Sequence, residues 1–290
     1  MLGRKDSIID FLQIKAYELR CDVIDMIYHA GSGHPGGSLS AAEIVTTLYW
    51  HVMNIDPLRP AWEDRDRLVL SKGHACPIVY AALAHKGYFD RGVLKTLRHI
   101  NSLLQGHPDF RKTPGIDMTT GSLGHGLSIG LGMALGARQT SRDFQVYALL
   151  SDGELQEGLT WEAAMATSHH RVNNLTAIVD YNNLQVDGHV NEVMNIEPLL
   201  DKWRAFGWEA LSADGHDIPS LMAAFETRRN EMREHKPCVI VCKTVKGKGV
   251  SYMEDIMEWH ASPVTKEQRD KAIAELKRTL VKLRKSKSAP

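Results

Sequence analysis

The chain contains no long apolar run and no excess of charge of one sign. No apolar stretch approaches the roughly 20 residues that a membrane-spanning helix needs. The N-terminal segment MLGRKDSIIDFLQ lacks the apolar core and the small-residue cleavage site of a secretory signal. Lys and Arg together number 35, as do Asp and Glu, so the formal net charge is zero. We therefore expect neither a membrane protein nor a nucleic-acid binder, which normally carries a basic excess or stripe.

Cysteine is scarce as well: the 290 residues include only four, which are Cys21, Cys76, Cys238 and Cys242. They form no CxxC pair, and so few cysteines in a chain of this length are not a disulfide framework. Cys238 and Cys242 belong to the apolar run CVIVC, where buried strand residues are the simpler interpretation. The expectation is a cytoplasmic protein with reduced thiols.

Short apolar runs alternate with helical patterns along most of the chain. Apolar residues at helical spacing predict a helix over 7–29, and the turn-rich segment 31–37 predicts a loop after it. Ser40 and Glu43 have the spacing of a capping box, which predicts that Ser40 begins the next helix. Further helices are predicted at 75–86, 124–138, 159–171, 196–206, 218–234 and 266–285, and strands at 67–70, 146–150, 176–180 and 239–244.

This alternation predicts an α/β fold, a parallel sheet with helices on both faces, because near-continuous apolar strands must be buried on both sides. In such sheets ligands bind at the carboxyl ends of the strands, so the loops that directly follow strands are the informative ones. We expect one domain over 1–265, followed over 266–290 by a C-terminal helix and a basic, solvated tail.

Two loops that follow predicted strands carry metal-binding residue types. Asp152 follows the strand VYALL, and Asn182 follows the strand TAIVD. Adjacent parallel strands would bring these residues to one edge of the sheet, where carboxylate, amide and backbone carbonyl oxygens suit Mg²⁺ or Ca²⁺. Gly153 allows close approach of a phosphate, which the next helix would meet with free N–H groups. DG and NN are each common turn formers, but both together favour a diphosphate–metal site.

The segment from Ser151 to Asn183 resembles the thiamine-diphosphate signature, which usually begins GDG and ends NN. Ser151 replaces the first glycine of that pattern. The resemblance implies that Asp152, Asn182 and the carbonyl of Leu184 hold the metal ion. It also implies that Gly153 lies beside the diphosphate.

Five further motifs are similar to those of the transketolase family. They are GHPG at 33–36, KGHA at 72–75, GHP at 106–108, TGSLGHG at 120–126 and, more weakly, WHA at 259–261. His125 stands where the family often has glutamine. A single histidine is more often structural or exposed than catalytic, but these matches follow the family's order over residues 7–262. The chain therefore resembles the diphosphate-binding (PP) domain of a transketolase.

The resemblance implies a chemistry and a role for each motif. Thiamine diphosphate would cleave the bond next to a ketose carbonyl and carry a two-carbon unit to an aldose, with sugars or sugar phosphates as substrates. Near the thiazolium and the substrate hydroxyls, histidines suit hydrogen bonding and proton transfer. The histidines implied are His34, His74, His107 and His260, of which His74 and His260 would also contact the cofactor. Gly121, Ser122 and Leu123 would lie against the cofactor, and Glu157 would meet a second carboxylate across a subunit contact.

The resemblance also indicates what is missing. A full transketolase continues with a pyrimidine-binding domain and a C-terminal domain, which hold the glutamate that activates the aminopyrimidine and most phosphate-binding residues. We therefore expect a separate partner subunit carrying these domains, an α₂β₂ assembly, and no turnover by this chain alone. Met1 and the basic tail favour a natural short subunit over a trimmed one.

Several alternatives remain open. The α subunit of a 2-oxo-acid dehydrogenase E1 shares the Asp152–Asn182 pattern but has no reason to carry the histidine loops. A 1-deoxyxylulose-phosphate synthase-like chain is disfavoured by the same loops and by length, and a non-catalytic thiamine-diphosphate-binding protein by the intact ligands. Pentose-phosphate transketolation is the default reaction, and an unusual ketose, branched or sulfonated, is the main variant.

Overall fold

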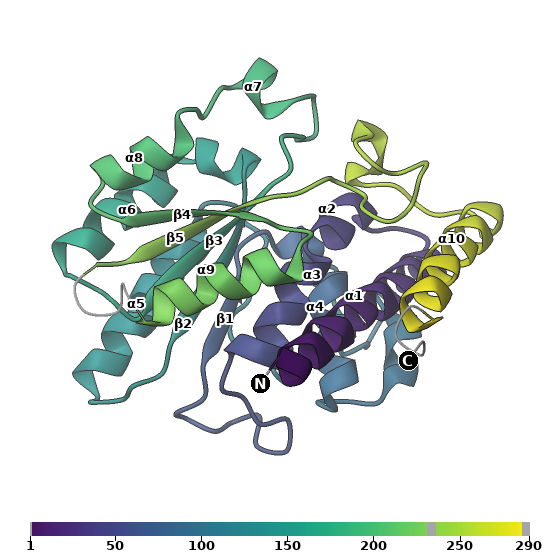
Figure 1. Cartoon of the computed structure of the whole chain (residues 1–290), viewed down its shortest axis with the longest axis horizontal. Coiled ribbons are helices and arrows are strands. Elements are labelled where there is room, and N and C mark those ends of the chain that lie inside the picture. Colours follow the sequence, from purple (N-terminus) through teal and green to yellow (C-terminus); the bar gives the residue numbers. More distant parts are fainter. Residues whose placement is uncertain (1, 231–235, 286–290) are drawn as a thin grey trace.

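A parallel sheet of five strands is the centre of the computed structural model, which describes residues 2–230 and 236–285 (Figure 1). The strands are β1 (Arg67–Leu70), β2 (Val146–Ser151), β3 (Leu175–Tyr181), β4 (Glu209–Asp214) and β5 (Cys238–Lys243). Their order is β1-β2-β3-β5-β4, and each neighbouring pair is parallel. The predicted α/β fold class is confirmed.

Helices cover both faces of this sheet. In chain order they are α1 (Leu2–Ala30), α2 (Pro35–Ser40), α3 (Ala42–Thr47), α4 (Cys76–Lys86), α5 (His125–Gln139), α6 (Gly158–His169), α7 (Val190–Val193), α8 (Leu199–Ala205), α9 (Ile218–Asn230) and α10 (Lys266–Lys285). One apolar core joins one face of the sheet to α1, α3, α4 and α9, and the other joins the opposite face to α5, α6 and α8. Alternate strand residues enter the two cores: Leu68 and Leu70 enter the first, and Val69 the second.

The predicted elements agree with the structure within a few residues, with two omissions, strand β4 and the short helix α7. Strand β4 was not predicted, because its sequence EALSAD contains no apolar run and only Ala213 is buried. It pairs with β5 alone and forms an edge of the sheet, so it needs no second apolar face. The predicted helix over 218–234 begins as expected at Ile218, and its last residues, 231–234, lie outside the described part of the chain.

Two predictions around residue 40 are wrong. The segment 31–37 is not a loop throughout, because α2 begins at Pro35, a residue that the first turn of a helix tolerates. Ser40 does not cap a helix. It ends α2, its hydroxyl donates to the carboxylate of Asp180, and α3 begins after Ala41 with no side-chain cap. A tertiary contact with a buried carboxylate has displaced the local capping interaction.

The last helix packs beside the first. α10 lies along α1 (Figure 1) and buries Ala272, Leu276 and Leu280. The predicted tail beyond residue 285 lies outside the described residues. Within 2–230 and 236–285, no helix combines the length and apolar character required to cross a membrane. The cytoplasmic location stays a prediction.

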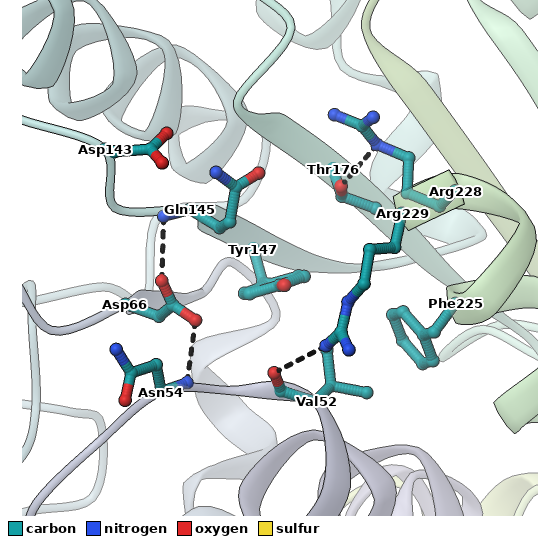
Figure 2. A pocket seen from close by; sticks show the side chains of 10 residues that line it. All are labelled: Val52, Asn54, Asp66, Asp143, Gln145, Tyr147, Thr176, Phe225, Arg228 and Arg229. Carbon is teal, nitrogen blue, oxygen red and sulfur yellow. Dashed lines mark hydrogen bonds between the residues drawn. The ribbon is translucent and has the colours of Figure 1, made fainter. Parts of the chain in front are cut away.

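A cavity of about 210 Å³ opens at the amino-terminal ends of β1, β2 and β3 (Figure 2). Asp66, just before β1, accepts the backbone N–H groups of Asn54 and Gln145, both at 2.8 Å. On α9, Arg228 donates to Thr176 at 3.1 Å. None of the predicted site residues lines this cavity, because they lie at the opposite, carboxyl-terminal ends of the strands.

Candidate active site

The four predicted histidines form one cluster at the carboxyl ends of the strands. The ring centre of His34 lies 5.3 Å from that of His74, 6.4 Å from that of His107 and 5.5 Å from that of His260. The rings of His74 and His260 are 5.3 Å apart. The structure therefore brings histidines from four separate segments of the sequence into one cluster.

Loops at the sheet edge and helix starts position these side chains. His34 immediately precedes α2, and His74 lies in a short 3₁₀ turn, Gly73–Ala75, that follows β1. His260 ends another 3₁₀ turn, Met257–His260. His107 lies in the segment between α4 and α5, where its backbone carbonyl accepts the hydroxyl of Tyr80 at 3.1 Å. Three of the rings thus lie in or next to helical turns, and the segment of His107 is tied to α4 through Tyr80.

Burial lowers the pKa of all four imidazoles, and neighbouring bases lower it further. The pKa of His34 falls to about 4 and that of His260 to about 3. The pKa of His74 lies well below its ordinary value, and that of His107 is also lowered. Arg98 contributes to the shifts of His34 and His107. The cluster is therefore uncharged at neutral pH, and each ring offers one donor and one acceptor.

Glycines allow the loops to approach one another. A Cβ on Gly121, whose φ is +148°, would lie 3.1 Å from the ring of His107, so the predicted cofactor loop passes directly beside that ring. A Cβ on Gly73 would lie 2.8 Å from the backbone N of Gly121. Ser122 is exposed and Leu123 half-buried. The TGSLGHG loop is thus adjacent to the KGHA and GHP loops.

The two predicted metal-binding strand ends also meet. Ser151 and Asp180 are register partners, so Asp152 and Asn182 leave neighbouring strands. Asp152 accepts a hydrogen bond from Gly153 at 2.8 Å and another from the backbone of Asn183. The amide oxygen of Asn182 accepts the N–H of Leu184 at 3.1 Å. Burial, followed by the charge of Asp180, raises the pKa of Asp152 to about 6.

The ammonium of Lys246, a residue that the sequence analysis missed, shows that this site suits a cation. Its buried ammonium donates to the carbonyl of Leu184, a predicted metal ligand, at 2.6 Å and lies 2.9 Å from Nδ1 of His260. Burial lowers its pKa to about 8, while Asp152 acts in the opposite direction. A carbonyl oxygen that accepts a buried ammonium, beside two carboxylates that repel each other, suits a cation such as Mg²⁺ or Ca²⁺. Lys246 lies just after the end of β5, so the strand-end rule could have found it.

A second missed group lies beneath the histidines. The carboxylate of Asp180, fully buried in β3, accepts the ammonium of Lys72 and the hydroxyls of Ser40 and Thr244. Burial acts to raise its pKa, but these partners lower it below the ordinary value. Lys72 also donates to the carbonyl of Gly37 at 2.7 Å. This network ties the GHPG, KGHA and β5 segments together. A charged residue ending the apolar run TAIVD was its signal.

Glu154 joins three of the predicted loops. Its Oε1 accepts the hydroxyl of Ser71 and the backbone N–H of Gly124, and its Oε2 accepts the N–H of Ser151. Burial raises its pKa. Glu157 lies nearby at the start of α6, is exposed, and packs its Cβ against Gly124. The exposed Glu157, predicted for a subunit contact, therefore lies beside the TGSLGHG loop.

Comparison with known families places this site in a class. The family model described as transketolase, thiamine diphosphate binding domain, matches residues 13–281. The fold and the match together define a thiamine-diphosphate-binding domain. The chain belongs to the transketolase family.

Its relatives include chains of similar length and chains twice as long. A 6-deoxy-6-sulfo-D-fructose transketolase subunit, SqwG, of Clostridium sp. (strain MSTE9) is 45% identical, over 92% of this chain and 96% of that protein. An apulose-4-phosphate transketolase subunit of Phocaeicola vulgatus is 40% identical, over 96% of this chain and 98% of that protein. The crystal structure of transketolase from Campylobacter jejuni superposes with a TM-score of 0.85 at 33% identity and covers 94% of this chain. This chain spans only 45% of the Campylobacter chain.

Proposed function

We propose that this chain is the cofactor-anchoring subunit of a two-chain, thiamine-diphosphate-dependent transketolase. The observation that carries the proposal is the cluster of four uncharged histidines beside the Asp152–Leu184–Lys246 site. When bound, thiamine diphosphate would supply the electron sink for cleaving and forming the carbon–carbon bond. Asp152, Asn182 and the Leu184 carbonyl would hold Mg²⁺ or Ca²⁺. Gly153 and Lys246 would face the diphosphate.

The histidines have the form that this reaction needs. Because each ring is neutral, it can donate to a substrate oxygen that gains negative charge and can accept a proton from a hydroxyl. His34 has a buried Nδ1 with no hydrogen-bond partner among the described residues. We assign His34, His74, His107 and His260 to the substrate and the reacting end of the cofactor. Gly121, Ser122 and Leu123 would line the cofactor itself.

The proposed partner is a second subunit with a pyrimidine-binding domain and a C-terminal domain. Support comes from relatives of similar length that are named as subunits and from the Campylobacter chain, of which this chain spans 45%. We place Glu157 at the contact between subunits and propose an α₂β₂ assembly. The division into a domain over 1–265 and a C-terminal helix and tail over 266–290 belongs to the same proposal.

The substrate class is a ketose that bears an anionic group. The two relatives described above are named for 6-deoxy-6-sulfo-D-fructose and for apulose 4-phosphate. Among donors we rank these unusual sugars together with pentulose phosphates, since the residues for the far end of the sugar are expected on the partner. A 2-oxo-acid dehydrogenase is disfavoured because its chemistry gives no role to the four-histidine cluster.

The test is a reconstitution. The chain is purified alone and with its partner subunit, and two-carbon transfer to an aldose phosphate is measured with thiamine diphosphate and Mg²⁺. A pentulose phosphate, a sulfonated ketose and a branched ketose phosphate serve as donors. We expect activity only in the mixture, and a loss of about 100- to 10,000-fold for His74→Ala. His170→Ala, which changes an exposed histidine directly after α6, is the matched control and should retain activity.

Each other outcome is informative. Turnover by the chain alone would refute the two-subunit proposal. Cofactor binding and complex formation without turnover on any donor would refute the substrate class. If neither the chain nor the mixture binds thiamine diphosphate, the site assignment itself is wrong.

A further inference from the structure

A buried charged cluster lies next to the candidate active site and has no role in the proposed chemistry. Arg20 of α1 is fully buried, and both of its terminal nitrogens donate to the carboxylate of Glu43 on α3, one of them at 2.7 Å. Arg20 also donates to the carbonyl of Leu39 at 3.1 Å. Burial raises the pKa of Glu43, but Arg20 and His216 outweigh it and hold the pKa at about 2. Glu43 is therefore a permanent buried anion.

His216 connects this anion to the loop after β5. Its Nδ1 lies 2.9 Å from Oε2 of Glu43, and its Nε2 accepts the backbone N–H of Val245 at 2.8 Å. Because a backbone N–H can only donate, Nε2 carries no proton and Nδ1 must be the donor to Glu43. The carboxylate thus fixes both the tautomer and the orientation of the ring. The ring in turn fixes one backbone group, the amide of Val245.

Val245 directly precedes Lys246. The ammonium of Lys246 contacts the Leu184 carbonyl and His260, so its placement depends on the backbone from which it extends. On the other side of Val245, the hydroxyl of Thr244 donates to Asp180. The loop is therefore held at two successive residues by two separate buried carboxylates. One of them, Asp180, lies within the site, and the other, Glu43, acts from outside it.

Stability alone does not account for such a cluster. Buried ion pairs are often no more stabilising than apolar residues of the same volume, since both charges must be desolvated. What they provide is a constraint on the orientation of the side chains, because each N–H is aimed at one acceptor. Here the Val245 N–H donates to His216, and both His216 and Arg20 donate to the carboxylate of Glu43. The geometry of a cofactor site depends on such supporting contacts.

We propose that Glu43 and His216 are positioning residues that hold the backbone of Val245 and thereby place Lys246 against the residues that bind the cofactor. The assignment of the cofactor rests on the proposed function. The link between His216 and Val245 rests only on the contacts described here. The two parts are therefore tested by different measurements.

The chain offers a matched control. His85, at the end of α4, also contacts a carboxylate, that of Asp22 on α1, at 2.6 Å, and its side chain is 5% exposed. It is thus a second, partly buried histidine–carboxylate pair. It lies at the opposite end of α4 from His74 and touches neither Val245 nor Lys246. A purely structural effect of losing a buried histidine should appear equally in both places.

The experiment compares His216→Phe with His85→Phe, using the full chain together with its partner subunit. Hydrogen exchange of the Val245 amide, thermal unfolding, the Kd of thiamine diphosphate with Mg²⁺, and kcat are measured. His216→Phe is expected to accelerate exchange at Val245 and to raise the cofactor Kd by about 10-fold or more. We expect kcat at saturating cofactor to change by no more than about twofold. His85→Phe should lower the unfolding temperature and leave the other three values unchanged.

Conservative variants extend the test. His216→Gln keeps an acceptor for the Val245 N–H and a donor for Glu43, so it should recover most of the cofactor affinity. If His216→Phe does not fold, Glu43→Gln replaces it, with the same expected order of effects. An unchanged Kd in a folded variant with faster Val245 exchange would overturn the positioning role. An equal rise of Kd in His85→Phe would overturn it as well. Unchanged exchange at Val245 would refute the link itself, even if the parent chain bound no thiamine diphosphate.

Discussion

The side of the sheet where the strands begin, here called the amino edge, differs from the side where they end, the carboxyl edge, in how its buried polar groups are hydrogen-bonded. At the amino edge, Asp66 is fully used by the chain, since its two oxygens accept the N–H groups of Asn54 and Gln145 (Figure 2). At the carboxyl edge, His34 Nδ1 and Asn183 Oδ1 are buried and have no partner among the described residues. Buried polar atoms are rarely left in this state without a reason. The comparison teaches that both oxygens of the amino-edge carboxylate are bonded within the fold, while two buried polar atoms of the carboxyl edge have no such partner.

The same contrast holds for the charged groups. At the carboxyl edge four charged residues interact with one another: Asp152, Asp180, Lys72 and Lys246. The pKa of Asp152 is raised and that of Asp180 is lowered. Such shifts are common at functional sites. The amino edge has a cavity and charged side chains as well, and burial raises the pKa of Asp66 there too, but both oxygens of Asp66 accept backbone N–H groups. A cavity alone is therefore a poorer guide to function than the surroundings of its polar atoms.

Removing the carboxylate of Asp152, the proposed metal ligand, should have the largest effect on the carboxyl edge. Asp152→Ala is expected to weaken Mg²⁺-dependent binding of thiamine diphosphate by about 100-fold or more and to abolish transfer, because residues that only support a metal ligand are already worth about 10- to 100-fold. Isothermal titration of the complex with cofactor, in the presence of Mg²⁺ and after its removal by chelator, measures this. Equal affinity in variant and parent would show that Asp152 is not a ligand.

Breaking the Lys72–Asp180 pair should cost stability at the carboxyl edge. Asp180→Asn leaves a fully buried ammonium without its counter-charge, which we expect to destabilise the chain by about 3–5 kcal/mol. Denaturant unfolding measures the loss. The double variant Lys72→Met with Asp180→Leu should be less destabilised than either single variant, since no lone charge remains. A strictly additive double variant would contradict the pairing.

The corresponding change at the amino edge should be smaller and without effect on function. Asp66→Asn keeps the shape but offers only one acceptor oxygen for two backbone N–H groups, so a loss of about 1–3 kcal/mol is expected. The cofactor Kd and kcat of the reconstituted enzyme should not change. A large loss of cofactor affinity would mean that the two edges are coupled, and the contrast drawn above would fail.

The lowered pKa values of the histidine cluster predict that the stability of the chain depends on pH. The ordinary pKa of histidine is about 6.5, and that of folded His34 is about 4, so below about pH 6.5 the unfolded chain takes up a proton first. Stability of the cofactor-free chain should therefore fall as the pH is lowered from about 6.5 towards 4. The charged and titratable groups facing His34 are His74, His107, His260, Arg98 and Lys246.

The measurement is the free energy of unfolding at several pH values, in His34→Asn and in the parent chain. The variant should show a shallower decline on the acid side, because one base with a depressed pKa has been removed. Identical slopes would contradict the lowered pKa of His34. His99→Asn, which changes an exposed histidine, serves as the control.

Much of the fold could be predicted because strands and helices are local patterns. The runs that form β1, β2, β3 and β5 were recognised from apolar residues alone, and Asp152 and Asn182 were placed correctly because they end neighbouring strands. Strand β4 escaped because an edge strand needs no apolar run. The capping box at Ser40 failed because Asp180, 140 residues away, offered its hydroxyl a better partner.

The sequence by itself determined the residue types of the site, the strand ends that carry them and the membership in a family. Motifs with short internal spacing contain that information. Only the tertiary structure decided which charges are paired. Arg20 and Glu43 are 23 residues apart, and Glu43 and His216 are 173 apart. No local pattern specifies such partners, because they meet only when helices α1 and α3 and the end of β4 pack around one core.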